Sequence, residues 1–161
     1  MLGRTYEGQD CSAARALELV GERWSLLIIR DAMFAGVTRF RDFQRRLGVA
    51  SNTLKSRLDS FVASGLMERR RYSDSPELHE YLLTDKGLDL QGVIVALLRW
   101  GDRWAAPDGP PAIYEHKTCG GRVDQQIHCM ACGETLSPGE VQTRRAGTTA
   151  ERHAELSSPV S

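Results

Sequence analysis

The pattern of hydrophobic and polar residues between positions 38 and 72 predicts a short helix, a turn, a second helix and then a strand. The first helix has an apolar face at helical spacing, formed by Phe40, Phe43 and Leu47. Gly48 is expected to end this helix, because glycine readily adopts the left-handed conformation found at helix ends. Thr38 is expected to cap its start.

The second helix is expected to begin at Ser51, acting as its N-cap, and to close at Gly65. Its buried side is predicted to consist of Leu54, Leu58, Phe61 and Val62. This arrangement is typical of a helix-turn-helix, whose second helix enters the DNA major groove. The candidates to contact bases or phosphates are Ser51, Asn52, Thr53, Lys55, Ser56 and Arg57. A helical hairpin with a solvated polar face fits the same pattern.

Residues 66–72 read as a strand, residues 73–77 are rich in turn formers, and residues 79–83 read as a second strand. A hairpin directly after a helix-turn-helix is the wing of a winged helix. The wing would carry three consecutive arginines towards DNA: Arg69, Arg70 and Arg71. The alternative is a solvated edge strand that charge keeps from pairing with other strands.

Charge is distributed unevenly along the chain, although the whole sequence has 21 basic and 21 acidic residues. Residues 36–72 contain nine Lys and Arg against three Asp and Glu, a net charge of +6 that the remainder balances. A basic centre in an acidic surround is what a localised phosphate-binding face requires. We expect phosphate contacts from Arg39, Arg41, Arg69, Arg70 and Arg71.

Further helices are predicted on both sides of this centre. Residues 11–20 have an apolar face, and the strongly apolar run at residues 24–34 is long enough for a buried helix. The face of the first of these helices consists of Ala13, Ala16, Leu17 and Val20. Thr84 is expected to cap a long helix that continues to Trp104 with a wide apolar arc. That arc either covers its own core or meets a second subunit, and we favour a homodimer.

The compartment is predicted to be the cytoplasm. No apolar run reaches the length of a membrane span, and the first residues lack the apolar core of a signal peptide. Thiols stay reduced in the cytoplasm, so the four cysteines favour metal binding or redox sensing over structural disulfides.

The sequence divides into an arm at 1–10, expected to be flexible, a domain at 11–105, a Pro/Gly linker at 106–113, a Cys-rich segment at 114–142 and a tail at 143–161, expected to be disordered. The Cys-rich segment offers two pairs at the spacing that grips one tetrahedral zinc ion: His116 with Cys119, and Cys129 with Cys132. It resembles a small zinc ribbon, with His128 as a competing ligand. A metal-free reduced tail or a Cys129–Cys132 redox pair are the alternatives.

Several separated motifs resemble the HxlR family of bacterial transcription regulators. They are Cys11–Asp31, Arg39–Phe43, Ser51–Leu58, Gly65–Arg69 and Tyr81–Gly87. The resemblance implies a winged-helix homodimer that binds a palindromic operator, with the helix from Ser51 as recognition helix. It implies dimerisation through the first helix and the long helix from Thr84. Some members sense oxidants or electrophiles through a cysteine placed like Cys11, and Arg15 one turn later would favour its thiolate. Packing against a partner helix is the other role for Cys11.

We therefore expect a mainly α (α+β) protein, a winged helix-turn-helix with a long C-terminal dimerisation helix and a small zinc-ribbon-like tail. The expected function is sequence-specific regulation of transcription, as a repressor, with double-stranded DNA and a second copy as partners. A small-molecule effector could occupy a pocket lined by tryptophans, although such residues are more often core: Trp24, Trp100 and Trp104. The alternatives are a metal- or thiol-dependent redox protein or enzyme, and a winged helix that binds protein. No catalytic constellation supports an enzyme.

Overall fold

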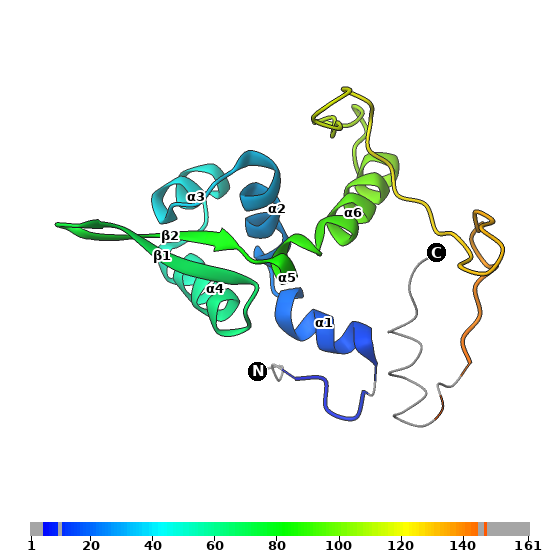
Figure 1. Ribbon diagram of the computed structural model, residues 1–161, viewed down its shortest axis with the longest axis horizontal. Coiled ribbons are helices and arrows are strands. Elements are labelled where there is room, and N and C mark those ends of the chain that lie inside the picture. Colours follow the sequence, from blue (N-terminus) through cyan, green and yellow to red (C-terminus); the bar gives the residue numbers. More distant parts are fainter. Residues whose placement is uncertain (1–4, 10, 145–146, 148–161) are drawn as a thin grey trace. The chain divides into compact units, whose positions relative to one another are not determined.

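The computed structural model describes residues 5–9, 11–144 and 147, and the chain divides into two compact units between Pro111 and Ala112. The arm predicted at 1–10 and the tail predicted at 143–161 lie partly or mostly outside the described residues. The first unit contains, in chain order, α1 (Ser12–Val20), α2 (Ser25–Ala35), α3 (Phe40–Leu47), α4 (Ser51–Ala63), β1 (Met67–Asp74), β2 (Glu77–Leu83), α5 (Asp85–Leu88) and α6 (Gln91–Trp104), shown in Figure 1.

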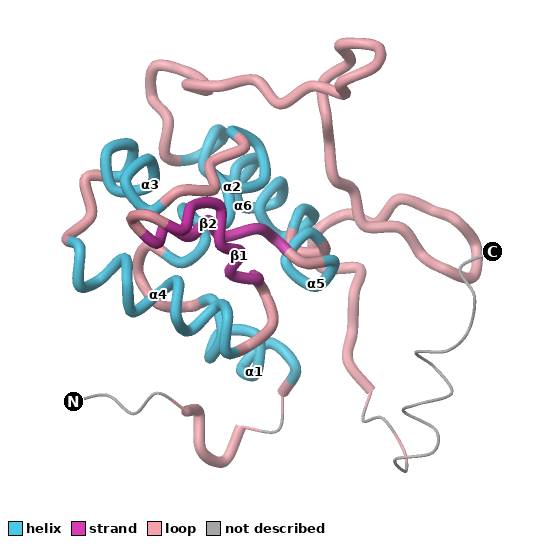
Figure 2. Tube along the Cα trace, turned by 60° about the vertical axis from the view of Figure 1, so that its left-hand side comes forward, coloured by secondary structure: helices cyan, strands magenta, loops and turns pink. Residues whose placement is uncertain are grey.

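The winged helix-turn-helix predicted from the sequence is present. Helices α3 and α4 are followed by an antiparallel hairpin in which Met67 pairs with Leu83 and Arg71 with His79. Strand β2 contacts α3 and β1 contacts α4, so the hairpin lies beside the helix pair (Figures 1 and 2). The core is one cluster, and its fully buried side chains include Ile28, Ile29, Phe43, Leu54 and Leu58.

Both N-cap predictions for the helix-turn-helix are wrong. The N-cap of α3 is Arg39, and Thr38 instead uses its carbonyl to accept from the Tyr81 amide at 2.7 Å. The N-cap of α4 is Ala50, and the hydroxyl of Ser51, now the first helical residue, accepts from the Gln44 side chain. Neither cap residue makes a side-chain cap hydrogen bond. The Ser51 hydroxyl, the group that a local cap would use, is therefore bonded to α3, and the Thr38 carbonyl joins the residue before Arg39 to β2.

The two helix ends follow the prediction. Gly48 has φ +64° after α3, and its amide donates to the Gln44 carbonyl. Helix α4 is followed by a similar turn, in which Gly65 has φ +71° and the Leu66 amide donates to the Phe61 carbonyl at 2.9 Å. These positive-φ residues set the direction in which the turn and then β1 leave the helices.

The helix predicted from Thr84 is divided. Thr84 caps α5 as expected, accepting from the Gly87 amide at 3.3 Å, but α5 ends at Leu88 and α6 starts only at Gln91. Helix α5 packs closely against the turn that follows α4. A Cβ at Gly87 would lie 2.2 Å from the Leu66 carbonyl oxygen, so α5 rests directly on the turn that ends α4. Lys86 adds a 2.8 Å bond to the Ser64 carbonyl.

The outer helices leave apolar side chains exposed. In α1 the buried residues are Ala14 and Val20, whereas three of the four residues predicted for the buried face are exposed: Ala13, Ala16 and Leu17. The prediction that Trp100 and Trp104 belong to the core is also wrong for the single chain, since they are 62% and 65% exposed. Trp24 does pack partly against the core. Helix α2, predicted at 24–34, is confirmed within one residue.

Residues 5–9, from the predicted arm, contact α1. The Tyr6 amide donates to the Glu18 carboxylate at 2.6 Å, and the Arg15 side chain donates to the carbonyls of Tyr6 and Gln9. Arg15 also pairs with Glu18 at 3.1 Å. These contacts place the described part of the arm beside α1, against side chains from both halves of the helix.

Candidate nucleic-acid interface

Helix α4 divides sharply into a buried and an exposed side. Leu54, Leu58 and Phe61 are at most 1% exposed and hold the helix against α3 and β1. The opposite side is exposed and polar, and consists of Asn52, Lys55, Ser56 and Asp59. Because these four follow helical spacing, they form one continuous face over the first two turns. This face can present amide, ammonium and hydroxyl groups to a groove.

The remaining predicted residues of α4 lie elsewhere. Ser51 is exposed but bonded to Gln44, and Thr53 is half-buried with its amide donating to the Asn52 side-chain oxygen at 2.8 Å. The Arg57 side chain is only 16% exposed and lies 3.7 Å from the Glu22 carboxylate, between α1 and α2. The structure therefore does not bring Arg57 together with the exposed face, and a role in base contact would require it to leave this ion pair.

Lys55 is paired within the face. Its ammonium donates to the Asp59 carboxylate one turn along α4, and this hydrogen bond and charge raise the pKa of Lys55. Lys55 therefore stays protonated at every pH near neutrality. A phosphate or guanine that replaces Asp59 as the partner of Lys55 would compete with an exposed ion pair, which contributes little to stability.

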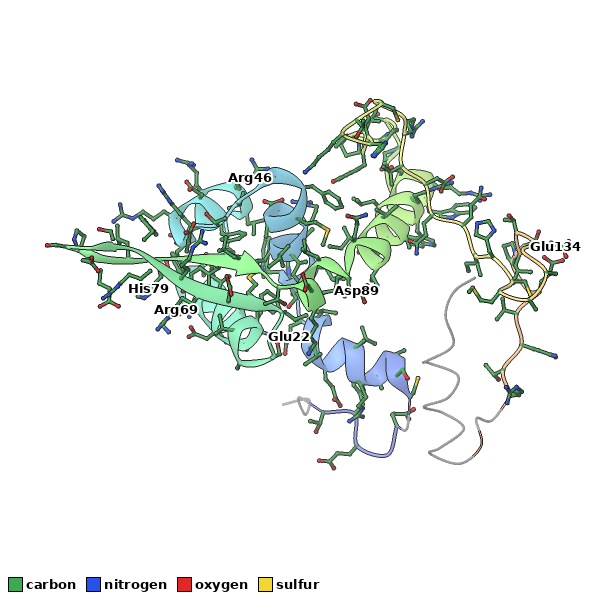
Figure 3. All side chains as sticks on the ribbon, viewed as in Figure 1. Glu22, Arg46, Arg69, His79, Asp89 and Glu134 are labelled. Atoms are coloured by element: carbon green, nitrogen blue, oxygen red, sulfur yellow. The ribbon has the colours of Figure 1, made fainter. Side chains whose placement is uncertain are left out.

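The three wing arginines divide between the two faces of the hairpin. Successive strand residues point to opposite faces, so Arg69 and Arg71 share a face with buried Met67 and Arg70 faces away. Arg70 pairs with Glu80 across the hairpin at 3.0 Å, and Arg71 pairs with Asp74 at 3.0 Å. Arg69, labelled with His79 on the hairpin in Figure 3, lines an open groove of about 590 Å³ beside α4.

Two further cations lie at the start of α3. Arg39 stacks on the Tyr72 ring of β1 at 4.5 Å and joins Glu80 of β2 in an isolated bridge. Arg41 is exposed in the first turn of α3. The sequence prediction missed Tyr72, whose ring holds Arg39 to the wing. An aromatic residue directly after an arginine run was the available signal.

A buried carboxylate connects α2 to α3, and the sequence analysis missed it as well. Asp31 is 3% exposed, and it accepts from Arg30 at 2.8 Å and 3.0 Å and from Arg46 at 3.2 Å. Arg46, labelled in Figure 3, belongs to α3, so this group fixes α3 relative to α2 and thereby supports α4. Its signal in the sequence was an acid within an apolar run.

The four predicted metal ligands occur as two pairs. His116 Nδ1 lies 3.2 Å from Cys119 Sγ, and the amides of Cys132 and Ala131, followed by the Cys132 thiol, hydrogen-bond the Cys129 sulfur and lower the pKa of Cys129. Across the part of the chain that the structure describes, no three His, Cys, Asp or Glu side chains lie close enough to hold one metal ion. The structure therefore brings each pair together but leaves the pairs apart. Cys11 is the exposed N-cap residue of α1.

Residues 19–109 match the family described as HxlR-like helix-turn-helix. The chain belongs to this family. An HTH-type transcriptional regulator of Mycobacterium tuberculosis is 48% identical over 141 residues, covering 87% of each protein. A crystal structure of a candidate transcription factor, PA1607, has 36% identity and a TM-score of 0.76, and the match covers 86% of this chain and 96% of that one. This HxlR-like protein is accordingly a DNA-binding transcriptional regulator of the helix-turn-helix type.

The similarity extends beyond the family domain. The match to the Mycobacterium tuberculosis regulator covers 87% of the 161 residues and leaves about 20 residues uncovered. More than 20 residues follow Gly139, so even a match that starts at the first residue extends past both Cys pairs. The redox regulator HypR in its reduced form is a more distant neighbour, with 26% identity and a TM-score of 0.53 over 58% of this chain. Within the described residues, no helix of this HxlR-like protein is long and apolar enough to cross a membrane.

Proposed function

We propose that this HxlR-like regulator is a cytoplasmic homodimeric repressor that binds a palindromic operator with α4 in the major groove. The observation that supports this most directly is the exposed polar face of α4, set on three buried side chains. Asn52 and Lys55 have the chemistry to read adenine and guanine, and Ser56 can bond base or phosphate. Arg69, which lines a groove with Asp59 of this face, and the exposed Arg41 of α3 are the proposed phosphate contacts. No enzymatic step is part of the proposal.

Dimerisation is supported by a stripe along α6. Val93, Leu97, Trp100 and Trp104 follow one another at intervals of four, three and four residues and are between 50% and 65% exposed. Such spacing places them on one face of the helix, and an apolar stripe of this kind is normally covered by a partner. Helix α1 offers Leu17, which is 47% exposed, to the same interface. A two-fold dimer would present two α4 helices to two half-sites one helical turn apart.

Regulation of this dimer is the second part of the proposal. Cys11 lies at the start of α1, a helix we place in the dimer interface, so oxidation of its thiol or binding of a small molecule nearby would change the distance between the two recognition helices. The similarity to the redox regulator HypR supports a thiol switch. A change in half-site spacing alters operator affinity, because the duplex fixes the spacing that the dimer must match.

The test is binding of the purified full chain to DNA from its own promoter region and to a scrambled duplex, by fluorescence anisotropy at two salt concentrations. We expect tighter binding to the promoter, by roughly 10³-fold or more, with an affinity that falls steeply with salt. Leu97→Glu should convert the dimer to a monomer in sedimentation and weaken promoter binding. Glu115→Ala, in the second unit, is the control. Equal, weak binding to both duplexes by a folded dimer would contradict the proposal.

A further inference from the structure

The Cys-rich segment contains two copies of one turn, thirteen residues apart. The amide of His116 donates to the Gly121 carbonyl at 2.8 Å, and the amide of Cys129 donates to the Glu134 carbonyl at 2.8 Å. The position equivalent to His116 in the second turn is therefore Cys129. Gly120 and Gly133 then close the turns equivalently, donating to the carbonyls of His116 and Cys129 at 2.9 Å and 2.7 Å.

The equivalence extends to the arms of both turns. The Val123 amide donates to the Tyr114 carbonyl and the Leu136 amide to the Ile127 carbonyl, each at 2.8 Å. Isolated bridges join Glu115 with Arg122 and His128 with Thr135, again thirteen residues apart. Each turn is thus a short hairpin, and we name them knuckle 1 (residues 114–123) and knuckle 2 (residues 127–136). Gly120 and Gly133 have φ +69° and +74° at equivalent positions.

Each knuckle places two metal-ligating side chains at the same points of the turn. In knuckle 1 these are His116 and Cys119, 3.2 Å apart, and in knuckle 2 they are Cys129 and Cys132. The amides of Ala131 and Cys132 point at the Cys129 sulfur, an arrangement that stabilises a metal-bound thiolate. The side chains of each pair therefore already face each other, as two ligands of one ion must.

Hydrophobic burial does not explain this regularity. Every residue from 112 to 144 is exposed or half-buried, and the apolar Ile127 and Met130 are 64% and 72% exposed. A segment with two ordered hairpins and no buried side chain lacks the usual source of folding free energy. Small domains of this kind obtain it from a bound metal or from disulfides.

We propose that knuckles 1 and 2 of one chain close around a single zinc ion held by His116, Cys119, Cys129 and Cys132. Three thiolates and one imidazole are a common tetrahedral set for structural zinc. The two pairs lie apart in the structure, and nine residues separate Cys119 from Cys129. At roughly 3.3 Å per residue this connection is long enough for the two knuckles to meet. Zinc binding would bring them together.

The repeat also distinguishes between the two histidines. His128 is equivalent to Glu115, which lies outside the turn, and its Nδ1 is 3.1 Å from the Thr135 hydroxyl. His116 is equivalent to the ligand Cys129. His116 is therefore the fourth ligand. The substitution His128→Ala is a matched control, because it removes an imidazole from the same segment without removing a proposed ligand.

The experiment measures zinc by elemental analysis in the full chain, purified reduced and without chelator. We expect about one zinc per chain. His116→Ala, Cys119→Ser and Cys132→Ser should each lower zinc affinity by more than about 100-fold, beyond the usual effect of an outer-sphere change. His128→Ala and Cys11→Ser should retain zinc. Cobalt substitution should give the absorption of a tetrahedral thiolate site, altered by His116→Ala. Helical circular dichroism should stay unchanged in all variants, because the ligands lie outside the winged-helix unit.

Mixing two deficient variants tests whether one chain supplies all four ligands. Cys119→Ser retains an intact knuckle 2, and Cys129→Ser retains an intact knuckle 1. If one chain supplies all four ligands, the mixture should bind zinc as weakly as either variant alone. Recovery of zinc in the mixture would mean that knuckles of different chains share the ion and would overturn the proposal. So would a zinc-free wild-type protein that fails to take up added zinc or cobalt, or equal zinc loss in His116→Ala and His128→Ala.

Discussion

The two units of this HxlR-like protein achieve order in different ways. Among the described residues of the winged-helix unit, thirteen buried apolar residues form one cluster, which includes Phe43 and Phe61. Residues 112–144 contain two short hairpins with equivalent backbone hydrogen bonds, yet no side chain in this range is buried. The first unit is stabilised by burial. The described part of the second unit has no buried core and contains the two pairs of proposed zinc ligands. Regular hydrogen bonding alone is therefore a poor guide to what stabilises a segment.

Metal removal should separate the two units most clearly. Structural zinc contributes on the order of 10 kcal/mol or more of folding free energy to small domains. A chelator should therefore abolish amide hydrogen-exchange protection in residues 114–136 and leave that of α2 and α4 unchanged. Mass-spectrometric hydrogen exchange, with and without chelator, measures both units in one sample. Loss of protection in α4 as well would show that the units are not stabilised independently.

Truncating a core side chain should destabilise the first unit, whereas metal removal should affect the second. Leu58 is fully buried, so Leu58→Ala should lower the free energy of unfolding of the winged-helix unit by about 2–5 kcal/mol. Ile127→Ala, at a 64% exposed position in the second unit, should change it by less than about 0.5 kcal/mol. Urea denaturation followed by circular dichroism gives both values. Comparable losses would contradict the contrast between the units.

Within the first unit, the buried carboxylate is expected to contribute less than the apolar core. Asp31→Asn leaves Arg30 and Arg46 without their charged partner, and since both guanidinium groups are partly exposed, we expect about 1–3 kcal/mol of destabilisation. Asp42→Asn removes one carboxylate charge from an exposed pair with Arg45 and should cost at most about 0.5 kcal/mol. Thermal denaturation compares them. Equal effects would mean that the Asp31 ion pairs stabilise the unit no more than an exposed ion pair does.

Much of the winged-helix unit could be predicted from the sequence. Its helices bury one face, so apolar residues recur in the sequence at helical spacing. The positions of Phe43, Leu54 and Leu58 in the core follow from spacing alone. The caps at Thr38 and Ser51 could not be predicted correctly, since the Thr38 carbonyl is bonded to β2 and the Ser51 hydroxyl to Gln44, and local sequence contains neither tertiary contact. The break between α5 and α6 was not predicted, because the apolar positions from Leu88 to Trp104 are consistent with one continuous helix.

The residue types of the candidate interface could be predicted, but the ion-pair partners of these residues could not. Basic and amide side chains in residues 39–71 indicated DNA binding, and the exposed face of α4 agrees with this for Asn52 and Lys55. The ion pair of Arg57 with Glu22 joins α4 to the turn between α1 and α2. Local spacing does not contain this tertiary contact.

The measurement that tests the central proposal most directly compares Asn52→Ala with Arg41→Ala in promoter binding across a salt series. If α4 reads bases, Asn52→Ala should cost about 1–3 kcal/mol on the promoter, relax its preference over scrambled DNA and leave the salt slope unchanged. Arg41→Ala should weaken binding to both duplexes alike and reduce the slope by about one. Unchanged promoter preference in a correctly folded Asn52→Ala protein would contradict the assignment of Asn52 and the α4 face to base recognition.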